Sequence, residues 1–168
     1  KIYNCWSKCF LSGNNNIGGI IGSGNSNDLI SSDCIIKDCR SLVQIENGKQ
    51  FLGAISGSDK GTFKNNLFVS DDLCGINGLS YSGKAEPVSY QELIKLSGVP
   101  DEFKSFTVKF ISDGEILKTV KFNYGDNLDS SVYPDVPQKD DCYIKWSVSD
   151  FDNLHFDVIS EAEYVPFV

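Results

Sequence analysis

The amino-acid sequence predicts a mainly β protein, in which a solenoid of short stacked strands precedes a helical cap and a small β domain. In the first half a glycine-rich hexamer recurs, and a second pattern advances nearly in step with it. From Phe106 onward apolar residues alternate with polar ones, as in half-buried strands. We therefore expect a β-helix repeat domain at residues 1–86, a cap and linker at 87–103, and a β domain at 104–168.

The hexamer at residues 17–22 has counterparts at 52–57 and, more loosely, at 73–78. A second pattern at residues 2–7 aligns with 36–41 and then with 63–68. The hexamers are offset by 35 and 21 residues, and the second patterns by 34 and 27. Two patterns that advance together predict a unit of two short strands, which cannot bury a face alone and is typical of solenoids.

Alignment of the copies sorts their residues into columns. Side chains alternate across a strand, so we expect one column to point inward, its neighbour outward, and the next to occupy a corner without room for a side chain. The inward column is Ile20, Ile55 and Ile76, the outward column is Ile21, Ser56 and Asn77, and the corner column is Gly22, Gly57 and Gly78. The column of Asn4, Asp38 and Asn65 suits a turn, because short polar side chains there bond to the backbone.

A short helix is predicted directly after the repeats. Ser89 and Glu92 have the spacing of a capping box, in which each side chain bonds to the backbone of the other residue. Gly98 is a stop signal. We expect the helix to cover the open C-terminal end of the coil, which would otherwise expose unpaired strand edges. Its apolar residues at helical spacing are Tyr90, Leu93, Ile94 and Leu96.

Residues 104–168 predict a compact β domain close to the lower size limit for independent folding. Strands at 106–111 and 116–124 flank the pair Asp113 and Gly114, which favours a tight hairpin turn. Ile111 breaks the alternation within the first of these strands. Further short strands are expected at 143–147 and 160–164. Trp146, the largest side chain of this segment, is expected to anchor its core.

Composition argues against two classes of partner. The chain of 168 residues has a formal net charge of −8 and a single arginine, Arg40, whereas a nucleic-acid-binding surface needs clustered basic residues. No run of 18 apolar residues is present, so no membrane insertion is expected. No signal peptide is visible, and a chain that opens on strand-like sequence without methionine is typical of a piece cut from a larger protein.

The six cysteines follow no zinc-binding spacing. Free cysteine is among the most buried residue types, so we expect several to be small core residues, with one disulfide or a metal site as alternatives. Cys5 and Cys39 share a column, which fits an interior ladder of thiols. Such thiols can also oxidise where the geometry of a disulfide is met. The others are Cys9, Cys34, Cys74 and Cys142.

The first half resembles the GLUG-motif repeats of bacterial surface proteins. The family pattern of Ile-x-Asn-Cys-Tyr-Ser followed by Gly-Gly-Leu-Val-Gly is similar to residues 2–7 and 18–22. The second copy departs from it at Asp38, Arg40 and Ala54, and the third at Asn66 and Cys74. The resemblance covers residues 1–80 approximately, and it implies that the solenoid is a short right-handed parallel β-helix.

The second half resembles the Listeria–Bacteroides repeat, a module likened to the B-repeats of internalins. The resemblance covers residues 105–168 approximately, with order and spacing kept. It implies a small β-grasp-like domain in a Gram-positive cell-surface protein, and neither family is enzymatic in itself. The matching residues are Val108, Phe110, Asp113, Gly114, Tyr124, Gly125, Asp126, Pro134, Pro137, Tyr143, Trp146, Ala162 and Tyr164.

The glycine-rich segment 18–24 could cradle a phosphate at the start of a helix. No helix pattern follows it, and no Gly-Lys-Ser or Gly-Lys-Thr sequence is present. Asn27 also stands where the dinucleotide fingerprint needs its third glycine. We therefore interpret the hexamer as a strand of the solenoid, and we predict no cofactor and no cofactor-binding residue.

Carbohydrate-cleaving chemistry on a β-helix would need paired carboxylates. The acidic pairs all lie in turn-like segments, where solvated carboxylates are the ordinary state. His155 follows Leu154 near a turn, without a serine or cysteine motif, so we expect it to be a surface or half-buried residue. We therefore predict no catalytic residue. The acidic pairs are Asp71 with Asp72, Asp140 with Asp141, and Asp150 with Asp152.

Two loops and four aromatic residues are further candidates for binding. The loops at 25–28 and 58–61 offer oxygen ligands for calcium, but neither follows the EF-hand pattern, so no metal-binding residue is predicted.

Trp6 shares its column with Arg40 and Leu67, so it is expected to be exposed as part of a contact surface. The candidate sugar- or peptide-binding platform is Trp6, Tyr81, Tyr133 and Trp146.

These observations together favour a non-catalytic module of a secreted bacterial protein at the cell surface or cell wall. It would serve in adhesion to a host or microbial glycan or protein, or in spacing and display of other domains. One alternative is an accessory region of a large surface peptidase or glycan-degrading enzyme, and another is a β-helix carbohydrate-active enzyme. The uncapped N-terminal coil is an edge through which two copies could stack.

Overall fold

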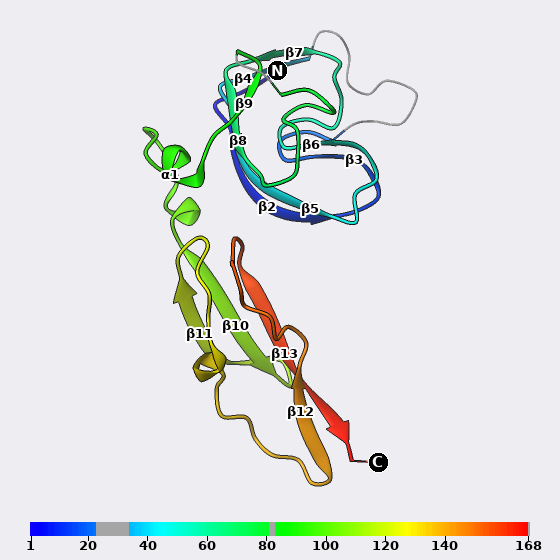
Figure 1. The fold of residues 1–168 in the computed structure, drawn as a ribbon, viewed down its shortest axis with the longest axis vertical. Coiled ribbons are helices and arrows are strands. Elements are labelled where there is room, and N and C mark those ends of the chain that lie inside the picture. Colours follow the sequence, from blue (N-terminus) through cyan, green and yellow to red (C-terminus); the bar gives the residue numbers. More distant parts are fainter. Residues whose placement is uncertain (23–33, 81–82, 168) are drawn as a thin grey trace. The chain divides into compact units, whose positions relative to one another are not determined.

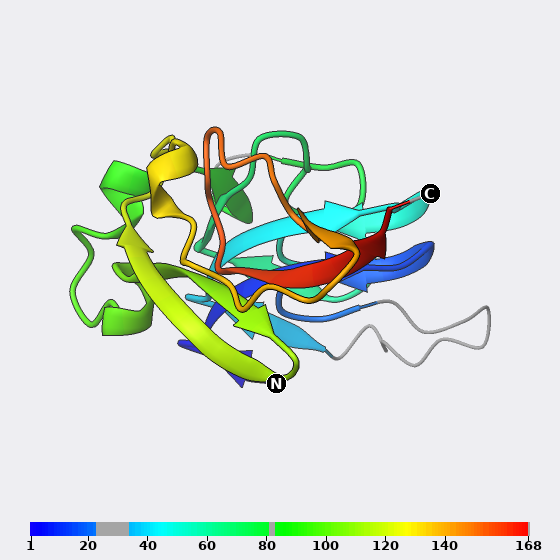
Figure 2. The same cartoon turned by 90° about the horizontal axis from the view of Figure 1, so that it is seen from below.

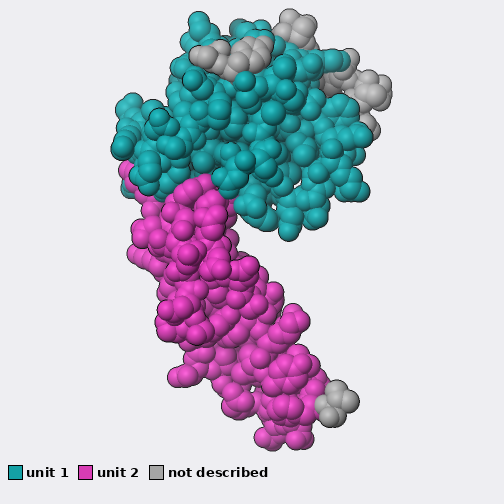
Figure 3. Space-filling view, viewed as in Figure 1, with its two compact units in different colours: residues 1–103 teal, residues 104–168 magenta. Residues whose placement is uncertain are grey.

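The computed structural model describes residues 1–22, 34–80 and 83–167, and within them the chain is mainly β. The chain divides into two compact units, residues 1–103 (unit 1) and 104–168 (unit 2), which Figure 3 distinguishes by colour. Each of the described sheets lies within one unit.

Unit 1 is built from parallel strands, and the strands within the sequence copies pair with the equivalent strand of the next copy. Strands β2 and β5 run side by side in both views (Figure 1 and Figure 2). The sheet orders are β1-β4-β7, β2-β5-β8-β9 and β3-β6. The strands are β1 (Ile2–Tyr3), β2 (Trp6–Ser12), β3 (Asn15–Gly18), β4 (Ile35–Lys37), β5 (Arg40–Glu46), β6 (Gln50–Gly53), β7 (Thr62–Lys64), β8 (Asn66–Val69) and β9 (Ala85–Pro87).

The strand register confirms the alignment of the copies for the first pattern. Ile2 pairs with Ile36, and Ile36 pairs with Phe63, which are the predicted offsets. In the hexamers Ile17 pairs with Leu52, again as aligned. The sequence pattern therefore gives the pairing of neighbouring strands residue by residue in these segments.

The third hexamer departs from the prediction by one residue. Ser56 pairs with both Ile21 and Ile76, whereas the alignment expected Ile76 to be level with Ile55. Ile55 and Ile76 are buried as predicted, but Ser56 is also fully buried, so its assignment to the outward column is wrong. The Ser56 hydroxyl is accommodated inside because it donates to the backbone oxygen of Ser58 at 2.8 Å.

The turn column is confirmed. Asn4, Asp38 and Asn65 have φ angles of 52°, 56° and 53°, the left-handed region that asparagine and aspartate tolerate better than most residues. The side-chain amide of Asn65 donates to the Asp38 carboxylate. This bond is the main reason why the pKa of Asp38 lies below its ordinary value, and Lys37, at 3.3 Å, lowers the pKa further.

The corner column is confirmed in two of its three members. A β-carbon at Gly22 would lie 2.7 Å from the backbone oxygen of Asn16, and one at Gly57 would lie 2.6 Å from that of Phe51. These contacts leave no room for a side chain. Gly78 faces open space, and it is needed for its φ of +75° instead.

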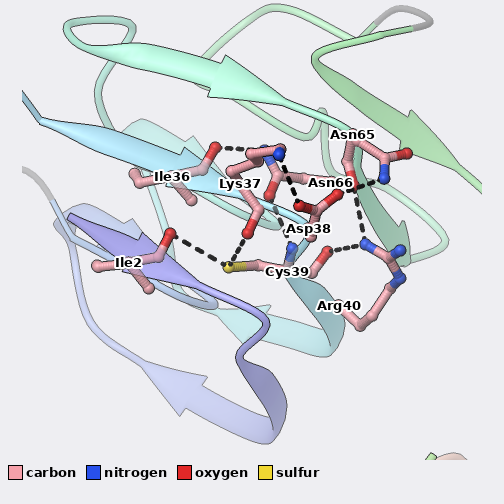
Figure 4. A network of polar contacts seen from close by, with 8 residues as sticks. All are labelled: Ile2, Ile36, Lys37, Asp38, Cys39, Arg40, Asn65 and Asn66. Carbon is pink, nitrogen blue, oxygen red and sulfur yellow. Dashed lines mark hydrogen bonds and ion pairs between the residues drawn. The ribbon is translucent and has the colours of Figure 1, made fainter. Parts of the chain in front are cut away.

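A buried asparagine ties the copies of unit 1 together beside the apolar core. The Asn66 side chain donates to the backbone oxygens of Ile36 (3.0 Å) and Lys84 (2.9 Å), and it accepts from the backbone N–H of Cys39 (3.0 Å). Figure 4 shows this residue among its neighbours. Three segments that are distant in sequence thereby satisfy one another's backbone groups away from water.

The predicted fold class is wrong in its finer part, because the described residues close no β-helix. The third hexamer turns back on itself instead of extending a ladder, so that Ile76 and Leu79 bond to each other around Gly78. A glycine at positive φ reverses the chain there at little cost.

The predicted capping helix is also absent from the described residues. Helix α1 (Tyr90–Leu93) has only four residues, although the capping box of Ser89 and Glu92 forms as predicted. The free edge of β8 is taken by β9 instead, and β9 ends at Pro87, which has no N–H to extend a ladder. The buried Leu93 packs this short helix near β8 without covering a coil end.

Unit 2 contains a four-stranded sheet in the order β11-β10-β13-β12, with β10 and β13 parallel and the outer pairs antiparallel. The predicted hairpin at Asp113 and Gly114 forms, and the irregular residue Ile111 lies at a bulge. The two later strands are also found where they were predicted. The strands are β10 (Phe106–Ser112), β11 (Glu115–Phe122), β12 (Cys142–Trp146) and β13 (Val158–Pro166).

The β-grasp-like prediction for this unit is wrong in one defining respect. A β-grasp sheet packs around a helix, but the crossing from β11 to β12 carries only a three-residue 3₁₀ turn, η2 (Ser130–Val132). Aromatic rings fill the place of a helix as the core. Phe110 lies 5.1 Å from Trp146 and 5.8 Å from Phe151, measured between ring centroids. The prediction that Trp146 anchors this core is confirmed.

Candidate interaction surface

The sheet of unit 2 has one buried face and one open face. Along β10, Val108 and Phe110 are fully buried, whereas Lys109 between them is exposed. Along β13, Ser160 is fully buried, whereas its neighbour Ile159 is 62% exposed. Successive side chains of a strand point to opposite faces, so exposed residues such as Lys109 and Ile159 share one surface. We call this surface the open face.

The open face mixes apolar and charged residues of both signs. Four of its large apolar residues are exposed, namely Ile116, Tyr143, Ile159 and Phe167. Exposed apolar side chains that gather on one surface are typical of contact sites. The strand registers assign to it Thr107, Lys109, Ile111, Ile116, Thr119, Lys121, Tyr143, Lys145, Ile159, Glu161, Glu163, Val165 and Phe167.

Two aromatic rings lie side by side at one end of the open face. Tyr143 of β12 is 48% exposed and Phe167, just past β13, is 66% exposed. Their centroids are 5.8 Å apart and their planes are inclined by 43°. The backbone N–H of Phe167 donates to the oxygen of Asp141 at 2.8 Å, which extends the ladder and fixes this end of the strand. The pair therefore presents a ring surface on ordered backbone.

Charged groups flank the aromatic pair. Lys145 and Glu163 occupy opposite positions in the β12–β13 register, two residues from Tyr143 and Val165, and both are exposed. An ammonium group and a carboxylate can respectively donate to and accept from the hydroxyl groups of a ligand, and bonds with an ionised partner are the stronger ones.

The described residues of the candidate aromatic platform each pack against another ring of their own unit. Trp6 packs edge-on against Phe103 at 5.3 Å and is only partly exposed. Tyr133 stacks on Trp146 at 5.5 Å within the core of unit 2. Tyr81 lies outside the described residues. The sequence analysis did not single out the exposed pair of Tyr143 and Phe167. A signal was present, because Tyr143 and Trp146 are three residues apart in one strand and therefore point to opposite faces.

The acidic pairs are exposed and engaged in local turns. Asp72 accepts from the Ser70 hydroxyl at 3.3 Å, and Asp150 accepts from the backbone N–H of Asp152 at 3.1 Å. Asp141 has a φ of 59°, and Asp140 precedes it at the same turn. The Asp150 contact is that of an Asx turn, in which the carboxylate accepts from the backbone two residues on.

His155 is half-buried, as predicted, and it packs on an aromatic ring. Its imidazole stacks on Tyr124 with 4.2 Å between centroids and an angle of 2°. Its Nε2 lies 3.1 Å from Oδ1 of Asn153. A parallel stack of this kind fixes the orientation of the imidazole beside the antiparallel bridge of Asp126 and Leu154.

The candidate calcium loops divide into one that can be described and one that cannot. Residues 25–28 lie outside the described residues. In the loop at 58–61, the Ser58 hydroxyl accepts from the backbone N–H of Lys60 at 3.2 Å, and the Ser58 backbone oxygen accepts from Ser56. These oxygens are used in the turn. Across the described residues, no three His, Cys, Asp or Glu side chains are gathered to hold a metal ion.

The glycine-rich hexamer has its backbone donors directed at the neighbouring strand. The N–H of Gly19 donates to Gly53, and those of Ile20 and Ile21 donate to Ile55, at 3.1 to 3.2 Å. A phosphate loop needs these groups to point at the ligand. The interpretation of residues 17–22 as a strand-pairing segment is therefore confirmed, while Ser23 and Gly24 lie outside the described residues.

A second surface feature in unit 1 is an open polar hollow beside the ends of β2 and β5. Its backbone groups are partly used by the ladder, because the N–H of Lys49 donates to the oxygen of Asn14 at 2.6 Å. It presents no aromatic ring. Its lining residues are Ser12, Gly13, Asn14, Asn47, Gly48 and Lys49.

Comparisons of the chain with protein-family models, with curated proteins and with solved structures gave no match. Within the described part of the chain, no helix has the length and apolar character required to cross a bilayer.

Proposed function

We propose that the chain is a non-catalytic, secreted module of a Gram-positive cell surface that binds a glycan through the open face, in an adhesive or display role. The observation that carries the proposal is the pair of exposed rings, Tyr143 and Phe167, beside Lys145 and Glu163. The sequence resemblance to surface modules supports the location, and the geometry of the rings supports the ligand class.

The chemistry of the pair suits a sugar ring. A pyranose has an apolar face of C–H groups and a rim of hydroxyl groups. Exposed aromatic rings can cover the apolar face, since such side chains combine a large hydrophobic area with few rotatable bonds. The charged groups nearby can bond to the hydroxyl rim. A site of few polar groups set around an apolar platform is typical of small-ligand recognition.

A glycan array probed with the full chain tests the proposal. We expect binding to a defined subset of glycans, and we expect Tyr143→Ala and Phe167→Ala each to weaken it roughly tenfold or more, as loss of a central aromatic contact does. Tyr3→Ala is the matched control, because Tyr3 is 45% exposed on β1 of unit 1. An array without signal for the unmodified chain would refute the function, and equal binding by all variants would refute the site.

A further inference from the structure

The first two turns of unit 1 place two cysteines opposite each other. Cys5 follows Asn4, and Cys39 follows Asp38, the two residues of equal left-handed conformation. The backbone pairing continues through both turns, because the N–H of Asn4 donates to Lys37 at 3.1 Å and the N–H of Arg40 donates to Cys5 at 2.8 Å. Cys5 and Cys39 are therefore neighbours on adjacent parallel segments.

The two sulfur atoms are held in equivalent positions. Sγ of Cys5 donates to the backbone oxygen of Tyr3 at 3.5 Å, and Sγ of Cys39 donates to that of Lys37 at 3.4 Å. Tyr3 and Lys37 are themselves paired. Sγ of Cys39 also lies 3.9 Å from the oxygen of Ile2, so it reaches across to the first segment, as Figure 4 shows.

This arrangement meets the spacing that a disulfide requires. Neighbouring strands are about 4.8 Å apart, and the α-carbons of a disulfide are usually about 4.4 to 6.8 Å apart. Side-chain rotation is then sufficient to join the sulfurs. No other two of the six cysteines are opposed in the registers, since Cys9 faces Val43 and Cys142 faces Pro166.

We propose that Cys5 and Cys39 are an oxidation site that closes to a disulfide and covalently links the first two copies of unit 1. The oxidant is a low-molecular-weight disulfide. The Cys5 thiolate attacks one of its sulfurs and releases one thiolate, which gives a mixed disulfide. The Cys39 thiolate then attacks Sγ of Cys5 and releases the second thiolate. Two protein thiols lose two protons and two electrons, and the oxidant becomes two thiols.

The exposure of the two residues sets the order of these steps. Cys5 is exposed, whereas Cys39 is fully buried. Burial raises the pKa of the Cys39 thiol. The exposed thiol of Cys5 meets the oxidant, and the buried thiol of Cys39, which the oxidant cannot reach, resolves the mixed disulfide. The inference is independent of the open face and of its ligand.

Peptide mapping of the full chain, oxidised with glutathione disulfide, tests the proposal. Trypsin separates the cysteines cleanly, because Cys5 falls in residues 2–8 and Cys39 in residues 38–40, while Cys9 and Cys34 share residues 9–37. After alkylation of free thiols, we expect one linked peptide of 2–8 with 38–40 and four alkylated cysteines. We also expect the melting temperature of unit 1 to rise by roughly 10 °C, since the link constrains the unfolded chain.

Two single substitutions supply the controls. Cys5→Ser alters an exposed position, and it should abolish both the linked peptide and the shift in melting temperature. Cys74→Ser alters the other exposed cysteine and should leave both unchanged. Glutathione retained on residues 2–8, or a link from 2–8 to 9–37, would overturn the proposal, as would six alkylated cysteines after exposure to the oxidant.

Discussion

Units 1 and 2 are both mainly β, but they bury their strands in different ways. Unit 1 stacks equivalent residues of successive copies, so that Ile36 lies between Ile2 and Phe63 in one parallel sheet. Unit 2 alternates along each strand, with Phe110 in the core and Lys109 on the open face. The first arrangement depends on contacts between copies, and the second depends on contrast between two faces of one sheet.

The polar groups of the two units differ in the same way. In unit 1 the buried Asn66 joins three segments that are far apart in the sequence, through bonds to Ile36, Cys39 and Lys84. In unit 2 the core is a cluster of aromatic rings around Phe110. The comparison indicates that unit 1 is specified by hydrogen bonds between copies, whereas unit 2 is specified by ring packing.

The largest expected effect is the loss of the central ring of unit 2. Phe110→Ala should lower the free energy of unfolding of this unit by about 3 to 5 kcal/mol, because it removes buried area and leaves a cavity among three rings. A small domain has little stability to lose. Peptide-resolved hydrogen exchange should show lost protection in residues 104–168 and retained protection in unit 1, whose core cluster contains no residue of unit 2.

Ile159→Ala is the matched control for the open face. Ile159 lies on β13 opposite Lys109 and is 62% exposed, so its truncation should change stability by less than about 0.5 kcal/mol. Equal losses of protection for the two variants would contradict the assignment of a buried face and an open face.

The second prediction concerns the polar interior of unit 1. Asn66→Ala should destabilise this unit by about 3 kcal/mol, because it leaves one buried N–H and one or two buried carbonyl groups without partners. Chemical denaturation with exchange detection in residues 34–80 measures the loss. Asn15→Ala, at an exposed position of β3, should have almost no effect. A tolerated Asn66→Ala would show that apolar stacking alone specifies unit 1.

Much of the strand pairing could be predicted from the sequence, because a parallel stack repeats its environment at each copy. The column of Ile2 requires an apolar residue in three copies, and the column of Asn4 requires a left-handed turn residue in three copies. This repetition makes even a short pattern recognisable in the sequence. The hairpin at Asp113 and Gly114 could be predicted from local sequence, since few residues adopt the positive φ angles of its turn. Signals of both kinds lie in the sequence itself and need no knowledge of distant contacts.

The wrong predictions share one physical cause, which is that segments distant in the sequence compete for the same strand edge or core position. Nothing near Ser89 shows that β9 occupies the edge of β8, so the sequence predicted a capping helix there. The burial of Ser56 depends on a one-residue shift of its partner Ile76. The exposure of Tyr143 and Phe167 depends on which rings fill the core, and the sequence did not show that Tyr133 would join Trp146 there. Such choices are made by tertiary packing.

The smallest expected effect is a difference in pH dependence between Asp38→Asn in unit 1 and Asp129→Asn in unit 2. Hydrogen bonds from Asn65 and from Ser131, respectively, hold the pKa of each aspartate below its ordinary value of 3.8. Each charge therefore contributes stability above pH 3.8, and the contribution is lost as the pH falls through the lower folded value. Each variant should match the unmodified chain at the lowest pH and be slightly less stable at pH 7.

The location of each loss sharpens the comparison of the units. Asp38 is bonded to a residue 27 positions away, so its loss should raise exchange in two copies of unit 1 together. Asp129 is bonded two positions away, at the start of the turn η2, so its loss should remain within that turn. Exchange measured by peptide at pH 7 separates the two outcomes. If the Asp38 variant lost protection only within its own sequence copy, polar bonding between copies would not distinguish unit 1 from unit 2.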